Sequence, residues 1–149
     1  MDHISDQDLT AAYKKRFTIP NGEFLNSAEK TAQHVTAFLG SKITEREYFL
    51  VILLNNRNHL LETVILFKGS LTASAVYAGE ILKLALRKNA AALIIAHNHP
   101  SGNMESSPAD KMLTTKIKDA VKLVDLNLLD HIIVVPGGDF YSFSDAGLI

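Results

Sequence analysis

Two imidazoles stand two residues apart in the segment His97-Asn98-His99-Pro100. In an extended chain, residues i and i+2 point to the same side, so both rings can approach one point. Asp110 follows near the start of an expected helix, where a short loop can bring its carboxylate back toward them. Two nitrogens and one oxygen suit zinc with an open fourth position, and such an open site is catalytic rather than structural.

The residues around Asp110 also fit a simpler interpretation. Ser107-Pro108-Ala109-Asp110 is a typical helix start, with serine as N-cap, proline at the first helical position and an acid at the third. On this alternative, Asp110 caps its helix and has no other role. The residues by themselves leave both interpretations open.

Composition restricts the class of protein. The chain has 149 residues, of which 47% are hydrophobic and 21% charged, as expected for one globular domain. It has no cysteine, which excludes disulfides and thiolate zinc sites. A net charge of −1 gives no bulk attraction to nucleic acid or anionic lipid. No apolar run approaches the roughly 20 residues that span a bilayer, and the N-terminus lacks a signal-peptide core. We therefore expect a cytoplasmic protein with no membrane partner.

Helices and strands alternate along the chain. Hydrophobic periodicity, Ser caps and turn residues predict an α/β or α+β fold with a mixed sheet. The expected helices cover 5–16, 27–39, 75–88 (capped by Ser74) and 108 to about 126. The expected strands cover 48–54, 60–67, 91–97, 128–135 and 139–143, with the first two paired as a hairpin.

The metal-ligand pattern resembles a known signature. His97, His99, Pro100, Ser107 and Asp110 match every defined position of H-x-H-P-x6-S-x2-D, the JAMM motif of the JAB/MPN metalloprotease family. The wider similarity, in GSLTAS (69–74), NAAALIIAHNHPSG (89–102) and LLDHIIV (128–134), is to the RadC-like branch. It covers about 45–149 and implies a JAB/MPN-like (cytidine-deaminase-like) mixed sheet sandwiched by helices. Residues 1–44 would then form an amino-terminal helical arm.

The resemblance also implies an activity. It suggests a zinc-dependent hydrolase that cleaves a peptide or isopeptide bond through a metal-activated water, with Zn²⁺ held by His97, His99 and Asp110. Ser107 would donate a hydrogen bond to the developing oxyanion, and Glu47 would accept the proton of the water. Glu45 is close enough in sequence to be the second candidate for that role. The implied partner is a peptide or protein, with ubiquitin-like substrates typical of the family.

The chain departs from the RadC-like pattern at two places. Its first 45 residues lack the glycine hairpins of the helix-hairpin-helix domain that such proteins often carry. It also reads Tyr77-Ala78-Gly79-Glu80 where the family typically has His-Pro-Arg-Glu, so no role of that arginine carries over.

Two alternatives to hydrolysis remain. RadC-like proteins carry a historical DNA-repair label, and Lys111, Lys118 and Lys122 share a helix face that could contact phosphates. Asp119 and Asp125 interrupt that face, so an ordinary solvated surface is the competing interpretation. The other alternative is a non-catalytic metal-binding MPN scaffold.

The remaining histidines are expected to serve structure. We expect His3, His34 and His59 to be exposed polar residues of the arm and of the hairpin turn. His131 lies within an apolar strand, and we expect it to be a core histidine satisfied by a hydrogen bond.

Overall fold

A computed structural model describes residues 5–69 and 78–149 of the chain. Its elements in chain order are α1 (Asp6–Phe17), α2 (Ala28–Leu39), the 3₁₀-helix η1 (Gly40–Thr44), β1 (Tyr48–Leu54), β2 (Leu60–Lys68), α3 (Ala78–Arg87), β3 (Ala92–Asn98), α4 (Pro108–Lys122), β4 (Asn127–Val134) and β5 (Phe140–Ser142).

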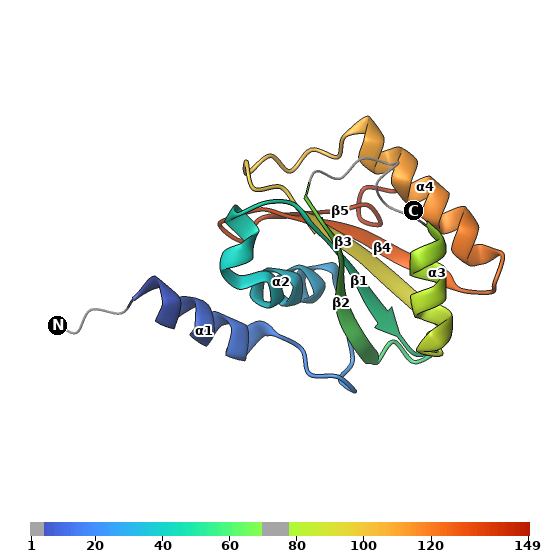
Figure 1. The fold of residues 1–149 in the computed structure, drawn as a ribbon, viewed down its shortest axis with the longest axis horizontal. Coiled ribbons are helices and arrows are strands. Elements are labelled where there is room, and N and C mark those ends of the chain that lie inside the picture. The colour runs from blue at the N-terminus through green and yellow to red at the C-terminus, as the bar shows by residue number, and fades with distance from the viewer. Residues whose placement is uncertain (1–4, 70–77) are drawn as a thin grey trace.

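The strands form one mixed sheet in the order β2-β1-β3-β4-β5. β1 pairs antiparallel with both β2 and β3, β3 pairs parallel with β4, and β4 pairs antiparallel with β5. The expected hairpin of β1 and β2 is therefore confirmed, as is the mixed character of the sheet. A parallel pair needs a crossover, and α4 supplies it between β3 and β4 (Figure 1).

Helices cover both faces of the sheet. α2 packs on one face, and α3 and α4 pack on the other (Figure 1). Every residue of the central strands β1 and β3 is buried, as the uninterrupted apolar runs predict for strands covered on both sides. The predicted sheet sandwiched by helices is confirmed.

Local caps explain where the first two helices begin. Ser5 Oγ accepts a hydrogen bond from the Asp8 backbone N–H at 3.1 Å, and Ser27 Oγ accepts one from Lys30 at 3.1 Å. Gly40 ends α2 with a φ of 58°, a left-handed conformation that favours glycine. Both helices match the predicted ranges to within one residue at each end.

One boundary was wrong and one element was missed. The helix predicted from 108 to about 126 ends at Lys122, because the chain turns through Asp125 (φ 60°) to bury Leu126 and to align Asn127 with Ala92. The 3₁₀-helix η1 was not expected. Ser74, the expected cap of the third helix, lies outside the described residues.

His34 corrects another expectation, since its side chain is buried rather than exposed. Its Nδ1 accepts a hydrogen bond from the Ile19 backbone N–H at 2.8 Å, and its Nε2 lies 2.8 Å from Thr63 Oγ1. The ring therefore ties the segment after α1 to β2. Periodicity missed this role because a histidine on a helix face gives no sign of the segment that will cover it.

Asn98 joins the end of β3 to the segment that leads into β1. Its side chain is completely buried; Oδ1 accepts from the Tyr48 N–H at 2.7 Å. Its Nδ2 donates to the carbonyls of Ile43 and Arg46, both at 2.9 Å. One amide thus fixes the backbone on both sides of residue 45.

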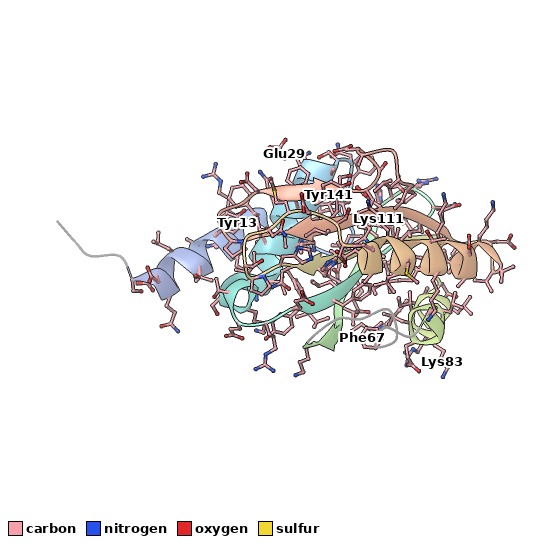
Figure 2. The ribbon with its side chains drawn as sticks, turned by 90° about the horizontal axis from the view of Figure 1, so that it is seen from above. Tyr13, Glu29, Phe67, Lys83, Lys111 and Tyr141 are labelled. Carbon is pink, nitrogen blue, oxygen red and sulfur yellow. The ribbon has the colours of Figure 1, made fainter. Side chains whose placement is uncertain are left out.

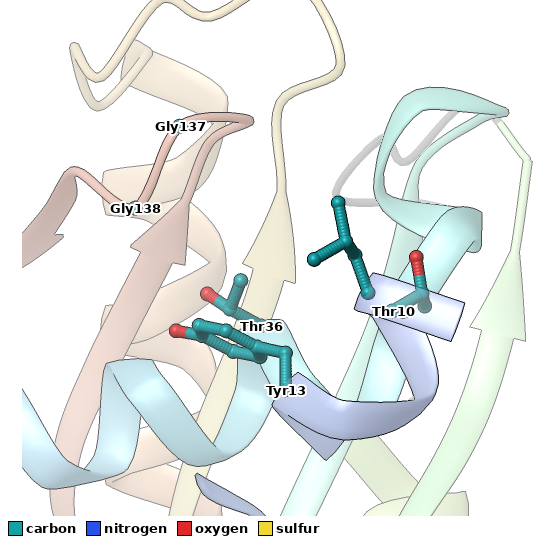
Figure 3. Close-up of a pocket in the computed structure, with 7 residues that line it drawn as sticks. Thr10, Tyr13, Thr36, Gly137 and Gly138 are labelled. Carbon is teal, nitrogen blue, oxygen red and sulfur yellow. The ribbon is translucent and has the colours of Figure 1, made fainter. Parts of the chain in front are cut away.

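α1 lies at the periphery. It packs against α2 and η1 but buries none of its own residues, and it extends away from the sheet (Figure 1). A hollow remains beside it, where Tyr13 and Thr36 lie across from the Gly137-Gly138 turn (Figure 3). In the part of the chain that the structure describes, no helix is long and apolar enough to cross a bilayer.

The burial of His34 predicts acid sensitivity. Burial lowers the pKa of His34 from 6.5 to about 4, so the native state resists a proton that the unfolded chain accepts. Stability from this group is therefore present above pH 6.5 and is lost as the pH falls toward 4. At pH 5 the loss is about 2 kcal/mol. In urea unfolding, the wild type should lose about 2 kcal/mol more stability between pH 7 and pH 5 than His34→Gln does. His59→Gln is the control, and equal pH dependence in wild type and His34→Gln would contradict the prediction.

The three hydrogen bonds of Asn98 predict a large effect of its removal. Asn98→Ala leaves the buried Tyr48 N–H and Ile43 carbonyl without their partner, each costing about 1–3 kcal/mol, and also removes the bond to the partly buried Arg46 carbonyl. We expect the free energy of unfolding to fall by about 3 kcal/mol or more, as measured by urea denaturation. The exposed Asn127→Ala is the matched control. A loss for Asn98→Ala within about 0.5 kcal/mol of wild type, the range of surface substitutions, would refute this role.

Candidate metal centre

The alternation of β3 places two histidines on one face of the sheet. His97 is the penultimate residue of the strand, and His99 continues its line because its N–H donates to the Val134 carbonyl at 2.9 Å. Both rings point toward the α4 side, and their Nε2 atoms lie 2.9 Å apart. The predicted convergence of the two imidazoles is therefore observed, with His97 buried and His99 partly open to solvent.

Asp110 reaches the histidines from the first turn of α4. Its Oδ1 lies 3.3 Å from His97 Nε2, and its Oδ2 lies 3.6 Å from His99 Nε2. One ligand atom from each of the three residues fits within a group whose members all lie within 4.8 Å of one another. This group could hold a metal ion.

Asp110 also forms the helix cap that the alternative interpretation predicts. Asp110 N–H donates to Ser107 Oγ at 3.0 Å, and Ser107 N–H donates to Asp110 Oδ2 at 2.9 Å, which completes a capping box. The two interpretations are compatible, because the cap fixes the same carboxylate that faces the histidines. Ser107 itself is exposed beside this group. Its Oγ accepts the bond from Asp110, so its hydroxyl proton remains available to another acceptor.

The hydrogen bonds of His99 show which nitrogen faces the group. Its Nδ1 lies 2.6 Å from the Asn103 carbonyl, which can only accept, so Nδ1 carries the proton. In the neutral ring, Nε2 then presents a lone pair toward His97 and Asp110. Acceptors that converge in this way need a cation between them, either a proton or a metal ion. The donor set therefore fits a metal such as zinc, whose ligands are neutral imidazoles and a carboxylate.

The pKa values of Asp110 and His99 are shifted by the contacts within this group. Burial by itself would raise the pKa of Asp110, but the neighbouring His97 and His99 rings and the hydrogen bond from the Ser107 N–H hold that pKa well below its usual range. The hydrogen bond to Asp110 raises the pKa of His99 against the opposing effect of burial. An ionised Asp110 carboxylate therefore favours positive charge at the adjacent ring nitrogens, which in the metal-free protein is a proton on His99.

Glu47 lies beside this group, and Glu45 does not. In the β1–β3 pairing, Phe49 aligns with His97, and extension of the same register by two residues brings Glu47 opposite His99. The half-buried Glu47 carboxylate contributes to the raised pKa of His99. Glu45 is exposed, and its Oε2 accepts a hydrogen bond from the Tyr48 hydroxyl at 3.0 Å.

Two further buried polar residues stand behind the histidines. His131 Nε2 lies 2.8 Å from His97 Nδ1, and His131 Nδ1 lies 2.6 Å from Thr114 Oγ1. The expectation that His131 is a hydrogen-bonded core residue is confirmed. Thr114 was missed, although its position four residues after Asp110 places both on the same helix face.

The lysines considered for DNA binding lie on the outer side of α4. Lys111, Lys118 and Lys122 are exposed, and Figure 2 shows Lys111 on the helix surface. Exposure is also what a solvated helix face requires, so DNA contact stays a prediction.

Comparisons with known proteins agree with the motif. A family model described as the RadC-like JAB domain matches residues 25–148. A UPF0758 protein of Aromatoleum aromaticum is 53% identical over 69% of this chain and 46% of its own length. UPF0758 proteins of Chromobacterium violaceum and Vibrio parahaemolyticus are 48% and 42% identical over 85% and 89% of this chain, and over 55% and 58% of their own lengths.

The chain spans about half the length of the curated relatives it matches. The family match begins at residue 25 and so includes α2, while the predicted division of the chain at residue 45 stays a prediction. The strand register, the His–His–Asp group and the family match together lead to one conclusion: this chain belongs to the RadC-like JAB domain family.

Proposed function

We propose that this protein is a zinc-dependent hydrolase that cleaves a peptide or isopeptide bond. The observation that carries the proposal is the convergence of His97, His99 and Asp110, beside the carboxylate of Glu47. Bound Zn²⁺ would lower the pKa of water to about 7 and polarise the scissile carbonyl. The amide substrate follows from family membership, and the C-terminus of a ubiquitin-like protein is the substrate class that the JAMM resemblance suggests.

Glu47 is the proposed proton acceptor. Its half-buried position opposite His99 lets the carboxylate take a proton from the attacking water and deliver it to the leaving amine. Glu45 is less suited to this task because its carboxylate is exposed and bonds the hydroxyl of Tyr48, whose side chain lies on the opposite face of the sheet from His97.

Ser107 is the proposed donor to the developing oxyanion. Its Oγ accepts from the Asp110 N–H, which holds the side chain at the rim and leaves the hydroxyl proton for a substrate oxygen. The same residue positions Asp110, so its loss would affect both binding of the metal and the reaction.

The metal centre is tested by zinc content and affinity. We expect near one Zn²⁺ per chain by mass spectrometry after reconstitution and dialysis. Asp110→Asn should lose this zinc, because the amide keeps the shape of the cap while removing the ligand charge. Asp119→Asn, an exposed acid of the same helix, is the matched control and should retain it. A parent protein that takes up no zinc would refute the proposed function.

The role of Glu47 is tested by separating binding from turnover. Glu47→Gln should keep zinc and reduce hydrolysis of a fluorogenic peptide library or of isopeptide-linked ubiquitin-like tails by roughly 10²–10⁴-fold. Glu45→Gln should hydrolyse the same substrates at the wild-type rate. If Glu47→Gln retains full activity, another group accepts the proton.

A further inference from the structure

A buried row of polar groups connects α4 to the rear of His97. Thr114 Oγ1 lies 2.7 Å from the Asp110 carbonyl oxygen and 2.6 Å from His131 Nδ1. His131 Nε2 lies 2.8 Å from His97 Nδ1. All three side chains are buried, so their hydrogen-bonding groups must be satisfied by one another.

The carbonyl at one end fixes the direction of every bond. A carbonyl oxygen only accepts, so the Thr114 hydroxyl donates its proton to Asp110. Thr114 Oγ1 must then accept from His131, which places the His131 proton on Nδ1. The His131 ring is completely buried, where an unpaired charge is costly, so the ring is neutral and its Nε2 carries no proton.

The direction set by the carbonyl determines which nitrogen of His97 is protonated. Because His131 Nε2 accepts, His97 Nδ1 must donate. A neutral His97 ring then has a free lone pair on Nε2, the atom that lies 3.3 Å from Asp110 Oδ1. The ring of His131 is itself held in place, stacked on Phe143 at 4.5 Å between ring centroids.

We propose that Thr114 and His131 are positioning residues that fix the tautomer and the ring orientation of His97 so that Nε2 faces the metal. This inference builds on the proposed metal centre and adds residues that are not ligands. Ligating histidines commonly donate their other N–H to a fixed acceptor. His99 meets this need with the Asn103 carbonyl in an exposed loop, whereas His97 depends on a row of side chains inside the core.

The opposite direction defines the competing state. If Thr114 donated to His131 Nδ1, His131 Nε2–H would donate to His97, and the His97 proton would move to Nε2. That proton blocks coordination. The Asp110 carbonyl selects between the two states through the Thr114 hydroxyl, so removal of this hydroxyl is the informative change.

The first measurement is the tautomer of His97 in metal-free protein, read from the ¹⁵N shifts of the ring by NMR. Wild type should show Nδ1–H. Thr114→Val removes the acceptor for His131 and should move His97 toward Nε2–H, while Thr114→Ser should restore the wild-type shifts. Thr115→Val is the matched control, since Thr115 makes the same type of bond to the Lys111 carbonyl on the exposed side of α4.

The second measurement is zinc affinity by competition with a chromophoric chelator. Thr114→Val and His131→Phe should weaken zinc binding by roughly 10–100-fold, the usual effect of removing such a partner. Thr114→Ser and Thr115→Val should bind as wild type does.

The outcomes separate this inference from the proposed function. Metal-free wild type with the His97 proton on Nε2, or Thr114→Val with unchanged tautomer and unchanged affinity, would overturn the positioning role. A wild type that binds no zinc would refute the hydrolase, while the tautomer shifts would still support or overturn the positioning. If Thr114→Val does not fold, the wild-type and Thr114→Ser spectra decide.

Discussion

The antiparallel pairing of β1 with β3 is the constraint on which the site depends. Phe49 aligns with His97, so side-chain alternation sends Glu47, His97 and His99 to the α4 face and Asn98 to the opposite face. A shift of the register by one residue would turn both histidines away from Asp110 and expose polar groups to the apolar core. Asn98 secures this arrangement, because its amide bonds the backbone at Ile43, Arg46 and Tyr48.

Polar groups inside a core are costly, and two networks in this protein offset that cost because their buried members satisfy one another. Thr114, His131 and His97 satisfy one another in sequence, and Asp130 accepts from Ser142 and from the Ser144 N–H. Such completed networks are rigid, because loss of any member leaves a buried group without a partner. The orientation of the His97 ring is therefore fixed by its hydrogen bond to His131.

Much of this organisation follows from the sequence. Apolar runs predicted β1 and β3, serine caps predicted α1 and α2, and the H-x-H spacing predicted that two imidazoles would converge. Contacts between distant segments were not predictable, since no local pattern encodes them. The burial of His34 depends on the strand that covers it, and the bond of His131 to His97 depends on the register of β3 with β4. The end of α4 was misplaced because Leu126 leaves the helix to fill the core.

The proposed metal ligands His97, His99 and Asp110 belong to one short stretch, 97–110, whose two ends are held by β3 and α4. A metal ion that cross-links residues 97 and 110 would close only a short loop, so it would remove little entropy from the unfolded chain. The folded chain already holds these residues together without the ion. A metal ion would therefore bind a preformed site, and folding would not require it. In zinc fingers, by contrast, the fold forms only when the ion is bound. Loss of that ion would leave the architecture intact, so metal supply would set how many folded molecules hold an ion and not how many molecules fold.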